Sequence, residues 1–570
     1  MSGPGDRAPK LILSEEQPTP LHQAEGHGAD PNNVDLDPSL SSGSESSARS
    51  QMFPAREPGD LDGASPSMVE GRQLRKGAKP HAAVEAVEES DEGIVPKKWS
   101  KTRVTPVEAT EGRPEAKGKF AARNASSTQR ETDALTPLQR IRQRAKGKPK
   151  EKWTTLLSHV KAPLLKEAFL RLRKDAATGV DGMTWGEYGA RLDERLIDLE
   201  NRIHRGSYHP QSLRRVHIPK GDGKTRPIGI PALEDKVVQQ AVRMVLEPIY
   251  ESEFIGFSYG FRPKKSAHDA LDALAIAIAG KVNWVLDADI RSFFDTIDHR
   301  HLQRFIEHRI GDRRMVHLLM KWVNAGVLEE GQLHAAQAGT PQGGLISPLL
   351  ANVYLHYALD LWVQLWRKKH ARGEMYVVRY ADDFVMAFQK EEDVRAMRQA
   401  LAERLAKFSL ELHPDKTRVI EFGRFAREDL ARRGLGKPET FEFLGFVHIA
   451  SADRRGKFQL KRQTSQKKRR AKLARLREET ERRRHHRVAE QYAWLSLVLN
   501  GHYRYYGVPT NSRCLKQFLQ AVKWMWHRSL QRRSQRGRWT VKHLRTFEQR
   551  FPLPTPRICQ PWPSQRFALR

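Results

Sequence analysis

Cysteine is nearly absent from this sequence of 570 residues. The two cysteines, Cys514 and Cys559, are far apart and form no C-x-x-C pair. This scarcity argues against a zinc ribbon and against a disulfide framework, because each needs several cysteines at set spacings. It is typical of a protein kept in a reducing interior, so we expect a cytoplasmic protein.

Long apolar runs are missing as well. No stretch of the chain reaches the roughly 20 apolar residues that a membrane-spanning helix needs. The first residues lack a basic start followed by an apolar segment, so they do not look like a secretory signal. We therefore expect no membrane partner.

Aromatic residues are scarce in residues 1–130, which are rich in Pro, Gly, Ser and acidic residues. Residues 1–60 alone carry four basic and ten acidic residues. Such a composition buries too little apolar surface to offset chain entropy, so we expect this acidic, polar segment to be disordered.

Positive charge is concentrated at the other end. The chain has a formal net charge of +31, and residues 451–570 hold 31 basic against 6 acidic residues. A dense positive surface attracts polyanions, since neutralised phosphates release their counterions. Charge alone does not distinguish RNA from DNA or from an anionic lipid surface.

Periodicity predicts the main elements between these extremes. Apolar spacing indicates helices in 162–172, 192–203 and 232–250, and a basic helical region with aromatics in 462–535. Alternation predicts a strand pair, 213–218 and 226–230, around a Pro-Gly-rich turn, and one sheet with helices across 281–390. Ser347 and Pro348 suit the N-cap and first residue of a helix, Leu349–Trp366, and residues from Phe551 onward look irregular.

Three acidic residues suggest a metal site. Asp382 and Asp383 lie between two apolar, strand-like runs, which predicts a hairpin with a two-residue connection. Asp289 ends another strand-like run, and carboxylates from two strands can hold two Mg²⁺ ions about 3.5–4 Å apart. The alternative is an exposed acidic turn, which the apolar flanks and the missing glycine disfavour. Asp287, Asp295 and Asp298 rank lower.

A series of motifs then resembles a known family. Tyr380-Ala381-Asp382-Asp383 resembles the palm signature of reverse transcriptases, and Asp289 followed by Phe294 looks like their first metal-binding motif. Further matches follow in family order: Ile218–Lys220 with Arg226-Pro227, Ser258–Pro263, Gly339–Gly344 with Ser347-Pro348, His413–Thr417 and Phe443–Phe446. Over about residues 150–550 the chain is similar to bacterial group II intron-encoded reverse transcriptase/maturases.

The resemblance implies an α+β fold: a right-hand polymerase with fingers, an antiparallel palm sheet and an α-helical thumb/maturase domain. The expected boundaries are a disordered segment (1–130), an N-terminal extension and fingers (131–280), a palm with the catalytic site (281–450), a basic thumb/maturase domain (451–550) and a Pro-rich tail (551–570).

The resemblance also assigns roles to individual residues. Asp289, Asp382 and Asp383 would be catalytic and would bind Mg²⁺, with Ile290 as a further metal-contact position. The expected nucleotide-binding residues are Lys220, Arg226, Phe294, Gln342 and Lys416. Lys220 and Arg226 are otherwise ordinary hairpin charges, Phe294 a core aromatic and Lys416 a surface lysine. The expected nucleic-acid-binding residues are Arg262, Lys467, Lys468, Arg469, Arg470, Arg532 and Arg533.

The implied function is RNA-directed DNA synthesis combined with splicing of group II intron RNA for intron mobility. The expected partners are that intron RNA, an RNA template, a DNA primer and deoxynucleoside triphosphates. Two alternatives stay open: an RNA-binding maturase with an idle polymerase site, and a domesticated reverse transcriptase in phage defence. Because the zinc-ligand cysteine pairs of longer family members are missing, we expect no zinc and no endonuclease domain.

Overall fold

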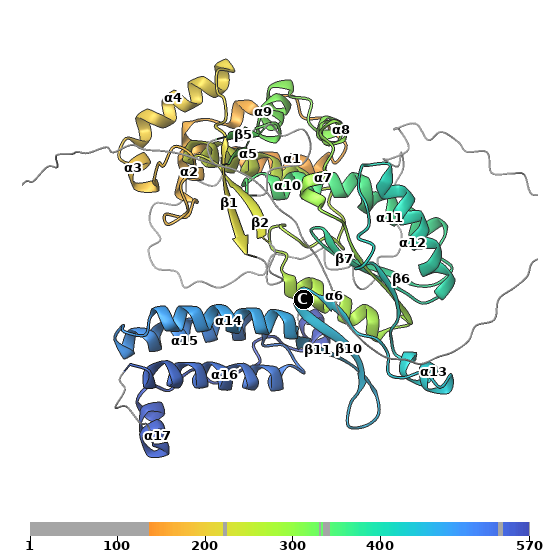
Figure 1. The fold of residues 1–570 in the computed structure, drawn as a ribbon. Helices are drawn as coiled ribbons and strands as arrows, with labels where there is room; N and C mark the ends of the chain where they lie inside the picture. The colour runs from red at the N-terminus through yellow and green to blue at the C-terminus, as the bar shows by residue number, and fades with distance from the viewer. Residues whose placement is uncertain are drawn as a thin grey trace, which may run out of the picture. The chain divides into compact units, whose positions relative to one another are not determined.

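The structure is a computed structural model and describes residues 136–219, 225–325, 327–329, 332–334, 343–533 and 540–568. All of the described residues belong to one compact unit of the chain. The segment predicted to be disordered, 1–130, lies outside the described residues. Figure 1 shows the arrangement of the elements.

The N-terminal part is helical, as the apolar spacing predicts. Its elements are α1 (Pro137–Gly147), η3 (Leu157–His159), α2 (Ala162–Leu170), α3 (Trp185–Gly189), α4 (Leu192–Arg205) and α5 (Leu233–Tyr250). Helix α4 buries Leu196, Leu199 and Ile203 and ends at Gly206, whose φ of 80° suits a residue without a Cβ. The amphipathic helix predicted over 232–250 is confirmed by α5.

The fingers strands form a sheet of four, in the order β2-β1-β4-β5. They are β1 (Leu213–Pro219), β2 (Thr225–Ile230), β4 (Val327–Glu329) and β5 (Gln332–His334). Strands β1 and β2 pair antiparallel, with Ile218 opposite Arg226, so the predicted hairpin is confirmed.

The palm sheet has the order β6-β7-β3-β8, and each neighbouring pair is antiparallel. Its strands are β3 (Trp284–Asp289), β6 (Met375–Tyr380), β7 (Asp383–Phe388) and β8 (Arg418–Glu421). Side chains alternate between two cores: Leu286 and Met386 join the larger one, Val285 and Val385 the one beneath α6. The antiparallel palm sheet predicted from the sequence is therefore confirmed.

Helices cover both faces of the palm sheet. One face carries α6 (Ala267–Ala279); the remaining palm helices are α7 (Phe293–Thr296), α8 (His299–Arg309), α9 (Arg313–Val323), α10 (Ser347–Leu355), α11 (Leu361–Lys369) and α12 (Glu391–Ala406). A π-helical turn, η4 (His356–Asp360), joins α10 to α11. The predicted N-cap at Ser347 is wrong, because Ile346 caps the helix and Ser347 is its first residue.

The C-terminal part begins with strands rather than helices. A sheet in the order β11-β10-β9 contains β9 (Phe441–Phe443), β10 (Phe446–Ala452) and β11 (Phe458–Thr464), preceded by α13 (Ala426–Arg432). Helices follow: α14 (Gln466–Arg482), α15 (Val488–Tyr506), α16 (Ser512–Gln531), α17 (Val541–Arg550) and α18 (Pro563–Ala568). The predicted helical region therefore starts too early, since residues 462–464 belong to β11.

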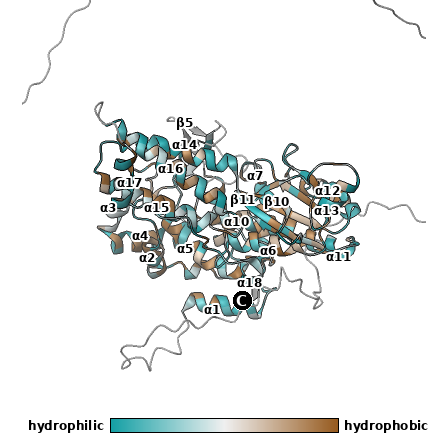
Figure 2. Cartoon of the chain, turned by 90° about the horizontal axis from the view of Figure 1, so that it is seen from below, coloured by the Kyte–Doolittle hydropathy of each residue, from teal (hydrophilic) through white to brown (hydrophobic). Residues whose placement is uncertain are grey.

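The helices α14, α15 and α16 share a third core built around Leu499, Phe518 and Trp526. Hydrophilic and hydrophobic residues alternate along them, as expected of amphipathic helices that cover a core (Figure 2). The tail predicted to be irregular ends in α18, where Arg566 pairs with Asp269 and Asp272 of α6. Among the described helices, none combines the length and apolar character needed to span a bilayer.

Candidate active site

The palm sheet brings the three predicted catalytic aspartates together. Asp289 is the last residue of β3 and Asp383 the first of β7, and the two are direct cross-strand partners. Asp382 lies in the two-residue turn that joins β6 to β7. The turn is Ala381-Asp382 rather than the predicted Asp382-Asp383. This one-residue difference puts Asp383 on the strand, opposite Asp289.

The turn has a backbone that suits a tight hairpin. Ala381 has a φ of 58°, the left-handed conformation that two-residue hairpin turns use. Gly260 packs against it: a Cβ added there would lie 2.3 Å from the Ala381 nitrogen. Only glycine allows this contact, so Gly260 and Ala381 together fix the position of Asp382.

Mutual repulsion and burial act on these carboxyl groups. Burial, together with the charges of Asp287, Asp289 and Asp382, raises the pKa of Asp383 to about 8. The pKa of Asp382 is also raised, by burial first and by Asp289 in addition, while Arg226 acts in the opposite direction. Carboxylates that destabilise one another in this way favour a cation as their partner.

A turn on the other side of the site also contacts Asp383. Strands β9 and β10 are joined by Leu444 (φ 49°) and Gly445 (φ 78°), the signature of a type I′ hairpin turn. The Leu444 amide hydrogen-bonds Asp383 and lowers its pKa. Tyr505, at the end of α15, donates its hydroxyl hydrogen to the Leu444 carbonyl at 2.9 Å, which ties the thumb helix to this turn.

Asp287, which the sequence ranks below the three aspartates, also acts on the site, because its charge raises the pKa of Asp383. It lies two residues before Asp289 on the same face of β3, and Arg418 on the neighbouring strand β8 pairs with it at 3.4 Å. Burial raises the pKa of Asp287 to about 6, despite the opposing effect of the Arg418 charge.

Lys416 lies at the site rather than on a remote surface. Its ammonium group contacts Asp289 Oδ2 at 2.5 Å. The loop before it is pinned to the end of β3, because the His413 amide donates to the Asp289 carbonyl at 2.8 Å and the Arg291 amide to that of Glu411 at 2.9 Å. Neither bond of this bridge uses the carbonyl of Ile290, whose side chain is buried.

The donor set fits divalent cations. No three His, Cys, Asp or Glu side chains within the described part of the chain are already spaced as a metal site. Lys416, however, donates a hydrogen bond to one carboxylate oxygen of Asp289. Its ammonium group thus supplies the positive charge that a metal ion would otherwise supply beside this carboxylate. The carboxylates of Asp289, Asp382 and Asp383 are the hard oxygen ligands that such ions prefer.

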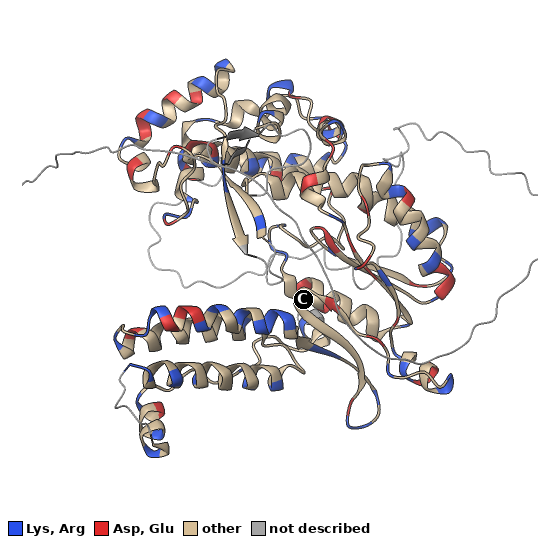
Figure 3. Ribbon diagram, in the orientation of Figure 1, with Lys and Arg blue, Asp and Glu red and all other residues tan. Residues whose placement is uncertain are grey.

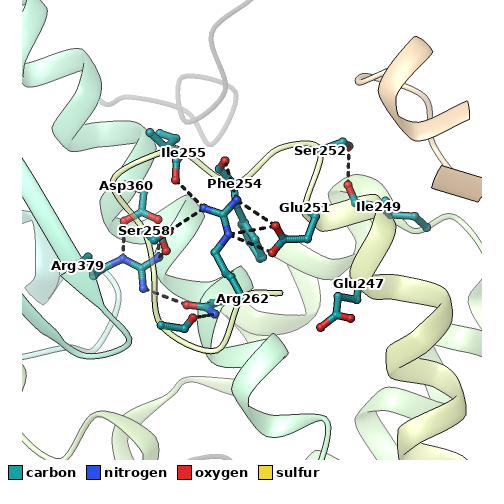
Figure 4. Close-up of polar contacts among 12 residues, drawn as sticks. Glu247, Ile249, Glu251, Ser252, Phe254, Ile255, Ser258, Arg262, Asp360 and Arg379 are labelled. Carbon is teal, nitrogen blue, oxygen red and sulfur yellow. Dashed lines mark hydrogen bonds and ion pairs between the residues drawn. The ribbon is translucent and has the colours of Figure 1, made fainter. Parts of the chain in front are cut away.

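A buried ion pair between Arg379 and Asp360, drawn in Figure 4, lies next to the turn. Arg379 and Asp360 are both fully buried, and the guanidinium donates to the two carboxylate oxygens at 2.7 and 2.5 Å. Arg379 also donates to the Ala381 carbonyl at 3.0 Å, to Asn352 at 3.1 Å and to Ser258 at 2.7 Å. The sequence motifs singled out neither Arg379 nor Asp360, although an arginine inside the apolar run 375–381 was a usable signal.

The prediction that Arg262 binds nucleic acid is wrong. Its side chain is buried and pairs with Glu251 at 3.0 Å. It also donates to the carbonyls of Ile255 and Ser258, both at 2.8 Å (Figure 4). The donors of the guanidinium group are thus engaged in contacts within the protein, and these contacts stabilise the loop after α5.

The predicted nucleotide contacts are only partly described. Lys220 and Gln342 lie outside the described residues. Arg226 is exposed on β2, and its charge acts on Asp382. Phe294, in α7, is 9% exposed against 2% for Phe293, so it is the less enclosed of the two rings. Their roles stay predictions.

Basic residues line the start of α14, as Figure 3 shows. Lys467, Lys468 and Arg470 are exposed, whereas Arg469 hydrogen-bonds Gln517 at 2.7 Å. Arg532 is exposed and Arg533 donates to the His486 carbonyl, which leaves the latter less free to bind a phosphate. The role of these residues in RNA binding stays a prediction.

Comparison with known proteins agrees with this geometry. Residues 218–448 match the family described as reverse transcriptase (RNA-dependent DNA polymerase). The chain is 38% identical over 274 residues to Protein YkfC of Escherichia coli K12, covering 42% of this chain and 71% of YkfC. It is 37% identical over 237 residues to the group II intron-encoded protein LtrA of Lactococcus lactis, covering 41% of this chain and 39% of LtrA.

A similar match is found among eukaryotes. An uncharacterised 91 kDa protein in the cob intron of Schizosaccharomyces pombe is 38% identical over 186 residues, which cover 32% of this chain and 23% of that protein. The predicted family and enzyme class are thereby confirmed. The chain belongs to the family of group II intron-encoded reverse transcriptases and maturases.

Proposed function

We propose that this reverse transcriptase uses two Mg²⁺ ions to add deoxynucleotides to a primer 3′-hydroxyl on an RNA template. The observation that carries the proposal is the convergence of Asp289, Asp382 and Asp383 at one end of the palm sheet. Bound Mg²⁺ would lower the pKa of the primer hydroxyl and neutralise the charge on the triphosphate and the leaving pyrophosphate.

The protein's own groups have distinct tasks in this scheme. The three aspartates hold the ions, and Arg226, on the fingers strand, adds positive charge on the triphosphate side. Lys416 pairs with Asp289 in the absence of metal ions, and with ions bound at Asp289 its ammonium group would be available to neutralise the pyrophosphate. Phe294 contacts the sugar and excludes a 2′-hydroxyl.

A primer-extension assay tests the proposal. Purified protein is given a DNA primer on an RNA template, with deoxynucleotides and a titration of Mg²⁺. We expect extension that depends on Mg²⁺ and falls at least about 100-fold in Asp383→Asn, since the ligand set is broken. Asp175→Asn, a change at an exposed carboxylate outside the palm, is the matched control. Equal extension by both variants would refute the assignment.

We further propose that the basic thumb/maturase helices bind intron RNA and assist its splicing. The support is the exposed positive charge on α14 together with the family relationship. A splicing assay with the Asp382→Asn/Asp383→Asn protein separates the two activities. Splicing should persist while extension is lost, and joint loss in a protein that still folds would contradict separate roles.

A further inference from the structure

Phe261 presents a large aromatic side chain next to the catalytic turn. Its side chain is 48% exposed, among the most exposed aromatics of the described residues. Its ring centroid lies 6.4 Å from that of Tyr380, the residue immediately before the Ala381-Asp382 turn. The contact with Tyr380 leaves about half of Phe261 open to solvent beside the turn.

The backbone at Phe261 is unusual as well. Its φ of 58° falls in the left-handed region, which a bulky residue rarely adopts and glycine adopts freely. Exposure and backbone strain both disfavour phenylalanine here. Strained residues of this kind concentrate at functional sites, where a side chain is needed in one fixed direction.

Both neighbours of Phe261 are anchored. On one side, the Gly260 carbonyl accepts a hydrogen bond from Asn352 at 2.8 Å, and its backbone packs directly on Ala381. On the other side, the buried Arg262 is held by Glu251 and two backbone carbonyls (Figure 4). The buried arginine thus serves as an anchor that keeps the neighbouring ring in place.

We propose that Phe261 is a nucleic-acid contact: its ring packs against the nucleotides of the primer–template duplex next to the primer terminus. The inference rests on the proposed function, which places the primer terminus at Asp382, the residue after Ala381. Aromatic faces bind bases and sugars of any sequence, as a polymerase that moves along its template requires.

Binding of a fluorescent DNA primer on an RNA template tests the contact without any catalysis. Phe261→Gly removes the ring and relieves the left-handed backbone, so thermal unfolding should show a protein at least as stable as the wild type. We expect its affinity for the duplex to fall about 5- to 100-fold, and Phe261→Trp to stay within about 3-fold of the wild type.

Phe425→Ala is the matched control. Phe425 is 46% exposed and precedes α13, so its loss removes a comparable ring from a different surface. The affinity of the Phe425→Ala protein for the primer–template duplex should equal that of the wild type. Unchanged binding by Phe261→Gly, or an equal loss in Phe425→Ala, would overturn the proposal.

A base analogue then locates the contact. With 2-aminopurine as the terminal primer base or as its template partner, quenching in the wild type that Phe261→Gly abolishes supports the contact; quenching that persists in the variant overturns it. The binding and quenching measurements need no catalysis, so their failure can be told apart from a failure of the polymerase assignment. A wild type that shows the Phe261 effect but extends no primer refutes the proposed function alone, and one that extends primers while Phe261→Gly binds normally refutes the contact alone.

Discussion

Two residues that sequence patterns did not single out, Arg379 and Asp360, support the turn that contains Asp382. They form a fully buried ion pair, and the same guanidinium donates to the Ala381 carbonyl in the catalytic turn. A buried ion pair adds little net stability compared with a well-packed apolar pair, but losing one partner leaves an uncompensated charge. The role of the Arg379–Asp360 pair is therefore to position the turn rather than to stabilise the fold.

Substitutions at this pair separate stability from position. Arg379→Met alone should reduce the free energy of unfolding by about 3–5 kcal/mol, because Asp360 stays buried without its partner. Arg379→Met with Asp360→Leu should recover most of that loss in urea unfolding. The Ala381 carbonyl still lacks its donor, so the Mg²⁺ concentration for half-maximal extension should rise several-fold. A double variant with the Mg²⁺ dependence of the wild type would contradict the positioning role.

In the proposed function, Lys416 would compete with a metal ion for Asp289, since its ammonium group is 2.5 Å from the carboxylate oxygen. Lys416→Met should therefore lower the Mg²⁺ concentration for half-maximal extension. If the lysine also serves the departing pyrophosphate, the maximal rate should fall by about 10- to 100-fold. A Mg²⁺ titration of extension rates measures both quantities. Unchanged values for both would contradict both roles of Lys416.

At the scale of elements, the first turns of α14 carry a cluster of exposed basic side chains. Replacing Lys467, Lys468 and Arg470 with alanine should weaken binding to structured RNA at low salt. The slope of log affinity against log salt concentration should become shallower by about 2–3, because three phosphate contacts are lost. A triple alanine variant at Lys368, Lys369 and Lys390, exposed palm residues, matches the charge change. An equal effect of both triples would show that only net charge matters.

Strand β10 contains a group that makes stability depend on pH. His448 is buried against Phe441, and burial, with a smaller effect of Arg462 opposite on β11, lowers its pKa to about 3. Its contribution to stability is full above pH 6.5 and is lost as the pH falls toward 3, because the unfolded chain binds the proton first. Compared with His448→Phe, the wild type should lose about 1.4 kcal/mol per pH unit below 6.5 in urea unfolding. If the free energies of unfolding of the wild type and of His448→Phe changed with pH in parallel, the lowered pKa of His448 would be contradicted.

At the scale of the whole molecule, local sequence patterns predicted the strands and helices well. They did not predict which side chains distant in the sequence contact one another. The strand that ends at Asp289 and the strand that begins at Asp383 were each readable from local alternation. That these two strands pair was implied by the resemblance to the family, because they lie far apart in the sequence. The partners of Arg262 and Arg379 were not readable, since a charged motif residue looks alike whether it faces solvent or a buried carboxylate. The strand over 462–464 was missed because its basic residues hid the alternation of β11.

The central claim is that residues 289 and 382–383 share a divalent cation site, and Fe²⁺-directed backbone cleavage tests it most directly. Fe²⁺ bound in place of Mg²⁺, with ascorbate and peroxide, cuts the chain beside the ion. We predict two clusters of cuts, near residue 289 and near residues 382–383, both suppressed by excess Mg²⁺ and both lost in Asp383→Asn. Cuts at one of these places only, or cuts that persist in the variant, would contradict the claim.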